Sequence, residues 1–324
     1  MKILICDSLE KEVIDIFSEI GEVTNISDDE NKEDQISKNI LDAEVVVIRS
    51  ATTITKELIN SAKQLKVIAR CGVGVDNIDL EQASKNNIYV TNSPNANIIS
   101  VAELTIGLII SAARNIHISN NSLKAGEWNR QKFTGTELYD KQLGLIGFGK
   151  AANEVAKRLS AFGMKIVFYD PYIEESKNEA TKVDLDHLMK TSDVISIHVN
   201  KTKETENLID SKALNMIKEG GIIVNTSRGG IVDEKSLFAL VDDKKIILGG
   251  LDVYEKEPPI VDEFFSNSNI VTTPHLGAST KEAQLKAGKQ TAENVKDILN
   301  GDLSSCLLYT SPSPRDATLS RMPS

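Results

Sequence analysis

Residues 143–152, which read LGLIGFGKAA, decide the fold. An apolar run ends there in a glycine-rich turn, and apolar residues at helical spacing follow the turn. Gly147 permits a tight turn, Gly149 lets the backbone approach a pyrophosphate, and Ala152 takes the position where the helix packs on the strand. The pattern predicts the strand, turn and helix of a dinucleotide-binding fold, although a strand–turn–helix unit without a cofactor also fits it.

The next apolar run strengthens this prediction. Residues 165–170 (KIVFYD) place Asp170 21 residues after Gly149, where an acid binds the ribose 2′-hydroxyl of a dinucleotide. Its charge would repel a 2′-phosphate, which favours NAD over NADP. The phosphates would lie at the helix N-terminus, whose free N–H groups attract anions. We therefore expect cofactor contacts from Gly147, Gly149, Lys150, Ala151 and Asp170.

Short apolar runs alternate with helix-like segments along the rest of the chain. This alternation predicts βαβ units and parallel sheets, with four strands in a first lobe and six in a second. A long helical pattern at 98–117 begins the second lobe, and a last one at 280–299 is long enough to return to the first. We expect an α/β protein in which a Rossmann-type NAD-binding domain (98–280) is inserted between residues 1–97 and 281–305 of the other lobe.

The last nineteen residues differ from everything before them. Residues 306–324 (CLLYTSPSPRDATLSRMPS) are rich in Ser and Pro, a composition typical of a disordered tail. The same string resembles the in-frame translation of a sequencing adapter. We expect this segment to be an adapter-derived artefact and exclude it from the prediction of the fold.

Composition narrows the class of protein. With 37 Lys and Arg against 47 Asp and Glu, the net charge is −10, which argues against general affinity for nucleic acid or anionic membranes. The N-terminus lacks the pattern of a signal peptide, and the three cysteines show neither paired nor metal-ligand spacing. We expect a cytoplasmic protein without a bound metal.

Three polar stretches follow the ends of later strands, where open parallel sheets bind ligands. They are 225–230 (NTSRGG), 252–259 (DVYEKEPP) and 273–279 (TPHLGAS). Arg228 suits two-pronged binding of a carboxylate, and His275 suits proton transfer near neutral pH. Glu257 is the candidate to fix the tautomer of that histidine. Each residue also has a simpler interpretation, because Arg228 would serve in a surface ion pair and His275 in a plain turn.

The chain resembles the D-isomer-specific 2-hydroxyacid dehydrogenases over about 1–305. The resemblance rests on ordered stretches at 48–55, 69–79, 92–104, 128–138, 143–150, 225–234, 251–259 and 274–284. It implies a flavodoxin-like substrate-binding domain around the NAD-binding domain. It also implies that Arg228 binds the substrate, that His275 is the general acid and base, and that Glu257 is its partner. Thr226 and Asp252 would face the nicotinamide, and Gly277 would also bind the cofactor.

The resemblance further implies a set of substrate-binding residues and a homodimer. The set is Arg49, Ser50, Arg70, Gly72, Asn97, Arg130 and Lys132, and its cations would surround the phosphate of a small phosphorylated 2-hydroxy acid, with Arg130 reaching across the dimer. A reductase of another small 2-keto acid, and an NAD-sensing scaffold of the corepressor type, remain alternatives. The helix opening at 150–153 departs from the family, which usually has isoleucine and a third glycine there.

Overall fold

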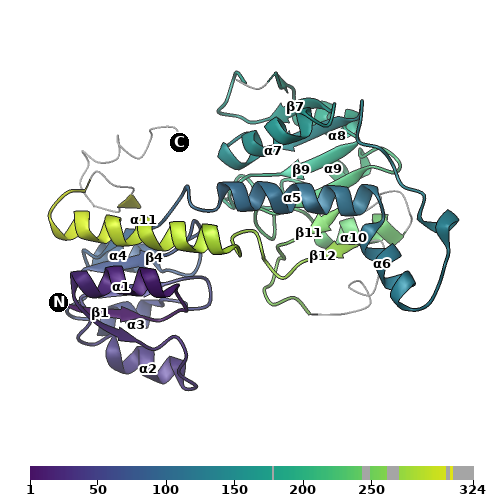
Figure 1. Ribbon diagram of the computed structural model, residues 1–324. Coiled ribbons are helices and arrows are strands. Elements are labelled where there is room, and N and C mark those ends of the chain that lie inside the picture. Colours follow the sequence, from purple (N-terminus) through teal and green to yellow (C-terminus); the bar gives the residue numbers. More distant parts are fainter. Residues whose placement is uncertain (177–178, 243–248, 261–269, 304–306, 309–324) are drawn as a thin grey trace. The chain divides into compact units, whose positions relative to one another are not determined.

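The computed structural model describes residues 1–176, 179–242, 249–260, 270–303 and 307–308. The chain forms two compact units (Figure 1). Unit 1 comprises Met1–Asn97 and the chain from Ala278 onward, and unit 2 comprises Ile98–Gly277. Unit 1 is therefore built from two separate segments of the sequence.

The sheet of unit 1 has five parallel strands and a short antiparallel one. Its order is β13-β5-β4-β3-β1-β2, and without β13 it is the order of flavodoxin-like sheets. The strands are β1 (Lys2–Ile5), β2 (Glu22–Asn25), β3 (Val45–Ile48), β4 (Val67–Arg70), β5 (Tyr89–Thr91) and β13 (Leu307–Leu308). Of the segment 306–324 that we expect to be an artefact, only β13 lies within the described residues.

Both faces of this sheet carry helices. Successive residues of β3 point to opposite faces, so that Val45 and Val47 join one apolar cluster and Val46 and Ile48 another. The first cluster includes residues of α1 (Lys11–Ile20) and α11 (Lys281–Leu299), and the second includes residues of α2 (Lys32–Asn39), α3 (Lys56–Ser61) and α4 (Leu80–Lys85). Burial on both faces explains why these strands are continuous apolar runs.

Unit 2 contains a seven-stranded parallel sheet in the order β12-β11-β10-β9-β6-β7-β8. Its central strands follow the Rossmann order, and the strand order reverses between β6 and β9. The predicted α/β fold with a Rossmann-type domain is confirmed. The strands are β6 (Gln142–Ile146), β7 (Lys165–Tyr169), β8 (Thr181–Lys182), β9 (Val194–Ile197), β10 (Ile222–Asn225), β11 (Gly250–Leu251) and β12 (Val271–Thr272).

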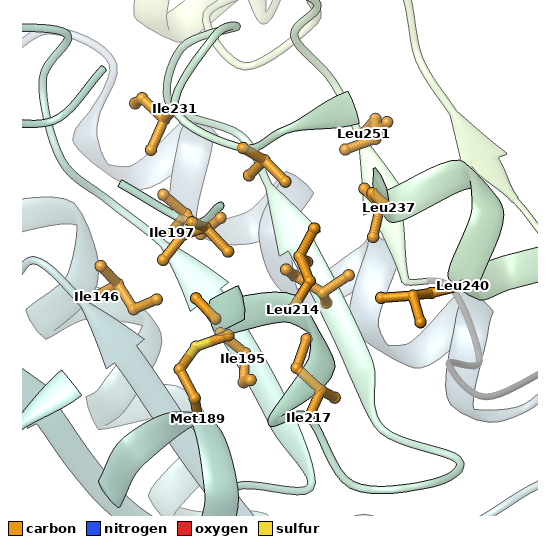
Figure 2. Packing of buried hydrophobic residues seen from close by; sticks show 14 of the residues in the cluster. Ile146, Met189, Ile195, Ile197, Leu214, Ile217, Ile231, Leu237, Leu240 and Leu251 are labelled. Atoms are coloured by element: carbon orange, nitrogen blue, oxygen red, sulfur yellow. The ribbon is translucent and has the colours of Figure 1, made fainter. Parts of the chain in front are cut away.

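Helices cover both faces of this sheet as well. On one face, α5 (Ile98–Ala113) and α7 (Lys150–Ser160) pack on alternate residues of β6 and β10. On the other face, α8 (Leu185–Thr191), α9 (Ser211–Asn215) and α10 (Glu234–Asp242) contribute to the cluster drawn in Figure 2. Ile195 and Ile197 of β9 belong to this cluster together with Leu214, Leu237 and Leu240. This packing leaves the carboxyl ends of the strands to carry the polar loops.

The structure differs from the sequence prediction at one helix. The single helix expected at 98–117 ends at Ala113, and α6 (Ile116–Lys124) continues after a bend of 64°. Asn115, with a φ of 55°, makes the break, and asparagine tolerates this left-handed conformation better than most residues. No single helix among the described residues is long and apolar enough to cross a membrane, and α5 and α6 reach that length only together, as a bent pair.

Candidate active site

The glycine-rich turn lies at the point where the strand order reverses, between the end of β6 and the start of α7. Gly147 has a φ of 84°, and a Cβ there would lie 2.7 Å from the carbonyl oxygen of His198. Around Gly149, in contrast, a Cβ would meet nothing within 4 Å. Gly147 is thus required by the fold, whereas Gly149 leaves open space in front of the N-terminus of α7.

Asp170 holds the glycine-rich turn from the neighbouring strand. Its Oδ2 accepts a hydrogen bond from the backbone N–H of Phe148 (2.8 Å), and its Oδ1 accepts from those of Tyr172 (2.8 Å) and Ile173 (3.2 Å). From the helix side, Asn153 Nδ2 donates to the carbonyl groups of Phe148 and Gly149. An ionised carboxylate has about four acceptor positions, so three backbone donors leave Asp170 one for a ribose hydroxyl.

The residues of this turn fit a dinucleotide. The helix N-terminus begins at Gly149 without a side-chain cap, so its first N–H groups are available to a phosphate. Ala152 is fully buried at the helix–strand contact, and Lys150 is exposed at the start of the helix. The alanine that stands in place of the usual third glycine therefore keeps the close packing that the fingerprint requires.

The structure brings His275 and Glu257 together. His275 Nδ1 lies 2.7 Å from Glu257 Oε2, and both side chains are partly exposed, at 42% and 38%. Glu257 Oε1 accepts a hydrogen bond of 3.1 Å from the backbone N–H of Tyr254. Partial burial opposes ionisation of Glu257, but His275 and the charge of Arg228 outweigh it, so the pKa of this carboxyl lies below its ordinary value. Glu257 is thus a carboxylate near neutral pH.

Arg228 lies in the loop that follows β10. The loop is closed by Asn225, whose Nδ2 donates to the carbonyl of Arg228 and whose Oδ1 accepts from the N–H and hydroxyl of Ser227. Gly229 lets this loop touch the segment that precedes Glu257, because a Cβ would lie 1.7 Å from the carbonyl oxygen of Tyr254. A close backbone contact therefore places the Arg228 loop beside the Glu257 loop.

Asp252 organises the turn that carries His275. Its buried carboxylate accepts from Thr273 Oγ1 (2.6 Å) and from the backbone N–H groups of Leu276 (2.6 Å) and Gly277 (2.8 Å). Burial raises the pKa of this carboxyl, and the three donors oppose the shift. His275 itself has a φ of 53°, an uncommon conformation for a residue with a side chain. Asp252 thus satisfies the backbone on the C-terminal side of that residue.

Two further residues, which the sequence did not single out, complete these loops. The hydroxyl of Tyr254 donates to the carbonyl of Thr273 (2.8 Å), which ties the Glu257 loop to the His275 turn. The hydroxyls of Thr105 on α5 and Thr226 lie 2.7 Å apart, and Thr105 donates to the carbonyl of Val101 (2.8 Å). Because Thr105 has one proton, Thr226 is the donor of the pair. No local sequence pattern signals such long-range contacts.

Of the other predicted residues of unit 2, Gly277 lies in the His275 turn, whereas Arg130 and Lys132 lie on a separate segment. Arg130 and Lys132 are exposed on the 3₁₀ helix η1 (Arg130–Phe133), and Lys132 Nζ lies 5.8 Å from the centre of the Phe133 ring. Gly277 donates to Asp252 and accepts from the hydroxyl of Ser100 (2.7 Å), so its backbone groups hold the turn. Their contacts to substrate and cofactor stay predictions.

Unit 1 carries the remaining predicted substrate residues, and all of them but Asn97 lie at or just after the carboxyl ends of its strands. Arg49 follows β3, and its Nη1 donates to the carbonyl of Ser8 (3.2 Å), while the next residue, Ser50, is exposed. Arg70 ends β4 and lies over Gly72, whose φ is 152° and where any Cβ would collide with the guanidinium. Asn97 is half-buried at the end of the first segment of unit 1. Arg49, Ser50, Arg70 and Gly72 therefore lie at the same edge of the sheet, whereas Asn97 lies six residues beyond the end of β5.

The fold and the loops of unit 2 define a class of protein. A Rossmann sheet with a glycine-rich turn at its switch point, an aspartate after the second strand and a histidine–glutamate pair after later strands is the arrangement of a nucleotide-dependent dehydrogenase.

Comparison with known proteins specifies the family. Residues 106–277 match the model of the D-isomer specific 2-hydroxyacid dehydrogenase, NAD binding domain. The chain belongs to this family and carries its NAD-binding domain.

Two curated relatives and one solved structure illustrate the similarity. The chain is 46% identical over 307 residues to D-3-phosphoglycerate dehydrogenase of Methanocaldococcus jannaschii, covering 94% of this chain and 58% of that protein. It is 44% identical over 292 residues to hydroxypyruvate reductase of Thermotoga maritima, covering 89% and 95%. NAD⁺-bound 3-phosphoglycerate dehydrogenase of Entamoeba histolytica has a TM-score of 0.81 at 31% identity, covering 96% and 99%. The chain thus spans little more than half of the first relative.

Proposed function

We propose that the protein oxidises 3-phospho-D-glycerate with NAD to 3-phosphohydroxypyruvate, the first step from that metabolite toward L-serine. The observation that carries the proposal is the 2.7 Å contact between His275 and an ionised Glu257, in a chain of the hydroxyacid dehydrogenase family. Three of the curated relatives that match along most of this chain are named D-3-phosphoglycerate dehydrogenase at identities of 40–46%.

In the proposed reaction His275 accepts the proton of the substrate hydroxyl. Glu257 occupies Nδ1 of the ring, which leaves Nε2 as the nitrogen for this proton. As the proton arrives the imidazole becomes a cation, and the carboxylate of Glu257 stabilises it. Arg228 would bind the substrate carboxylate through its planar guanidinium and so orient the reacting carbon.

The cofactor would be held by the glycine-rich turn and by Asp170. When bound, NAD supplies the acceptor for the hydride that leaves the substrate carbon. The backbone N–H groups at Gly149 and Lys150 would bind its phosphates, and Asp170 would bind a ribose hydroxyl. Thr226 and Asp252 are proposed at the nicotinamide end.

The cations account for a phosphorylated substrate on an acidic chain. With a net charge of −10, the protein repels anions in general, so a local group of cations is needed to attract one. Arg49 and Arg70 are proposed to bind the substrate phosphate from unit 1, together with Arg130 and Lys132. Arginine provides the geometry for two-pronged binding of a phosphate.

Steady-state kinetics test the proposal. The wild type should reduce NAD with 3-phosphoglycerate, and His275→Ala should lower kcat by on the order of 10²–10⁴-fold, the usual contribution of a general base. His187→Ala is the matched control, because His187 is an exposed histidine on α8. Equal rates in the wild type and in His275→Ala would contradict the proposal.

A second candidate is reduction of hydroxypyruvate, glyoxylate or another small 2-keto acid. It is favoured by the Thermotoga maritima hydroxypyruvate reductase, of which the chain covers 95%. A panel of phosphorylated and unphosphorylated acids separates the two, since Arg130→Ala should impair only a site that binds phosphate. Turnover of any acid in the panel excludes the alternative of a corepressor-type scaffold.

We also propose that the protein is a homodimer. From Arg114 to Glu137 no residue is buried, although the segment contains α6 and η1 and exposes Trp128, the only tryptophan, at 77%. Such a segment leaves apolar side chains exposed to solvent, and a protein partner would cover them. A second copy that covers it would also bring Arg130 to the partner's substrate, as the family resemblance implies. A cytoplasmic location stays a prediction from the sequence.

A further inference from the structure

A buried carboxylate lies beneath the predicted substrate loop of unit 1. Asp7 lies two residues after the end of β1, and it is 3% exposed. Its Oδ2 accepts from the backbone N–H groups of Arg49 (2.5 Å) and Thr52 (3.3 Å), and its Oδ1 accepts from Thr52 Oγ1 (2.7 Å). One side chain thus binds both ends of the loop 49–52.

A second side chain binds the same loop through its carbonyl groups. Asn77 Nδ2 donates to the carbonyl oxygens of Arg49 (2.7 Å) and Thr52 (2.5 Å). The N–H and the carbonyl of both loop ends are therefore satisfied by side chains from two other parts of unit 1. The backbone of the loop has no regular secondary structure of its own, so these contacts determine its conformation.

The charge of Asp7 is compensated by a lysine outside the loop. Lys32 Nζ, on α2, lies 2.5 Å from Asp7 Oδ1. Burial opposes ionisation of Asp7, but the contacts with Lys32, Arg49 and Thr52 outweigh it and lower the pKa of this carboxyl. An ionised acceptor makes stronger hydrogen bonds to N–H groups than a neutral one.

The Arg49 guanidinium depends on this arrangement. Its Nη1 donates to the carbonyl of Ser8, the residue after Asp7, so the backbone and the side chain of Arg49 are both fixed to the end of β1. We propose that Asp7 is a positioning residue for substrate binding. It would hold Arg49 in the position from which the guanidinium binds the anionic group of the hydroxy acid. This inference rests on the proposed function.

A double-mutant cycle tests it. Asp7→Asn, Arg49→Ala and the double variant are assayed with the acid that the substrate panel selects, 3-phosphoglycerate in the first instance. Asp7→Asn should raise the KM for the acid by about tenfold, because a displaced binding group loses much of its effect. The kcat and the KM for NAD should change by less than about twofold, and in the Arg49→Ala background Asp7→Asn should have almost no further effect.

Two further variants guard against a general loss of structure. Glu44→Gln removes a carboxylate at the opposite end of β3, where Glu44 accepts from the N–H of Lys2 and pairs with Lys66, and it should leave the KM for the acid unchanged. Asn77→Ala removes the hydrogen bonds to the carbonyl groups of the same loop. It should therefore raise the KM for the acid as Asp7→Asn does, and only when Arg49 is present. This variant tests the loop even if Asp7→Asn does not fold.

The outcomes separate the two proposals. An equal rise in KM in both backgrounds, or an unchanged KM in Asp7→Asn, overturns the positioning role while the protein remains an active dehydrogenase. A wild type that oxidises none of the acids in the panel contradicts the proposed function, and the positioning role falls with it. A rise in KM that disappears without Arg49 supports both.

Discussion

The backbone N–H of Leu276 donates a 2.6 Å hydrogen bond to the buried carboxylate of Asp252. Leu276 is the residue after His275, so the left-handed backbone of His275 is held in place by Asp252, which lies 24 positions before Leu276 in the chain. The proposed chemistry therefore depends on a residue that need not touch the substrate.

Asp252→Ala should affect both stability and turnover. The change leaves the hydroxyl of Thr273 and two backbone N–H groups without an acceptor, which should cost about 1–3 kcal/mol of unfolding free energy. Misplacement of His275 should lower kcat by on the order of 10²-fold. Asp210→Ala, which removes only the cap of α9, is the control and should cost about 1 kcal/mol without changing kcat. An unchanged kcat in Asp252→Ala would show that the turn keeps His275 in place without the carboxylate of Asp252.

Gly149→Ala should weaken NAD binding without weakening the fold. A Cβ at Gly149 meets nothing within 4 Å, so the free energy of unfolding should stay the same, whereas the methyl group would occupy the space proposed for the pyrophosphate. Gly107→Ala provides the control, because its Cβ also meets open space but lies in α5, and it should stabilise the protein by about 0.5–1 kcal/mol. Calorimetric titration with NAD decides the matter. Unchanged affinity in Gly149→Ala would place the phosphates elsewhere.

Glu234 should make the protein less stable as the pH rises. Burial, with the charges of Glu255 and Glu257, raises the pKa of this carboxyl in the folded state, so the folded protein binds more protons than the unfolded chain. The contribution of Glu234 therefore falls as the pH rises from the ordinary pKa of a glutamate, which applies in the unfolded chain, toward the higher pKa of the folded state. Glu234→Gln keeps an acceptor for the N–H of Glu255 and removes this loss.

Denaturant unfolding at several pH values checks this prediction, and Glu44→Gln gives the opposite sign. The pKa of Glu44 is lowered, first by its hydrogen bond with Lys66, so Glu44 stabilises the folded protein above its unfolded pKa and loses that effect as the pH falls through the folded pKa. As the pH rises, the free energy of unfolding of the wild type should therefore fall relative to that of Glu234→Gln. Relative to that of Glu44→Gln, it should rise. The same slope at both positions would contradict the assignment for Glu234.

Trp128 should report the proposed dimer. Within one chain it is 77% exposed, so its fluorescence in a monomer should resemble that of tryptophan in water. In the dimer its emission should shift to shorter wavelength, and dilution should reverse the shift as the mass measured by sedimentation falls. Trp128→Ala should weaken association by about 2 kcal/mol or more, since buried tryptophans are typical hot spots. Water-like emission from a species with the mass of a dimer would place the interface elsewhere.

The sequence predicted the parts of the fold whose signals are local. The run from β6 through the glycine-rich turn to α7 combines an apolar strand, glycines at fixed spacing and an amphipathic helix, so its fold could be predicted from its own residues. The edge strands β2 (EVTN) and β8 (TK) were missed, because they are short and mostly exposed and lack an apolar run.

The candidate site shows the same division. His275, Glu257 and Arg228 could be selected from residue type and from their places after strands, but the residues that hold their loops could not. Asp252 meets Leu276, and Gly229 meets Tyr254, only after the sheet has brought β10, β11 and β12 side by side. Such pairings depend on register between strands, which spacing along one chain does not reveal.

The division of unit 1 into two segments affects how this unit folds during translation. One face of its sheet packs on Ala292, Val295 and Ile298 of α11, which are translated only after all of unit 2. During synthesis only α1 can cover that face until α11 has been translated, and all of unit 2 emerges in the meantime. During the time between synthesis of the first segment and synthesis of α11, chaperones that recognise apolar strands would bind this face. A circular permutant that begins at Ala278 would shorten that time.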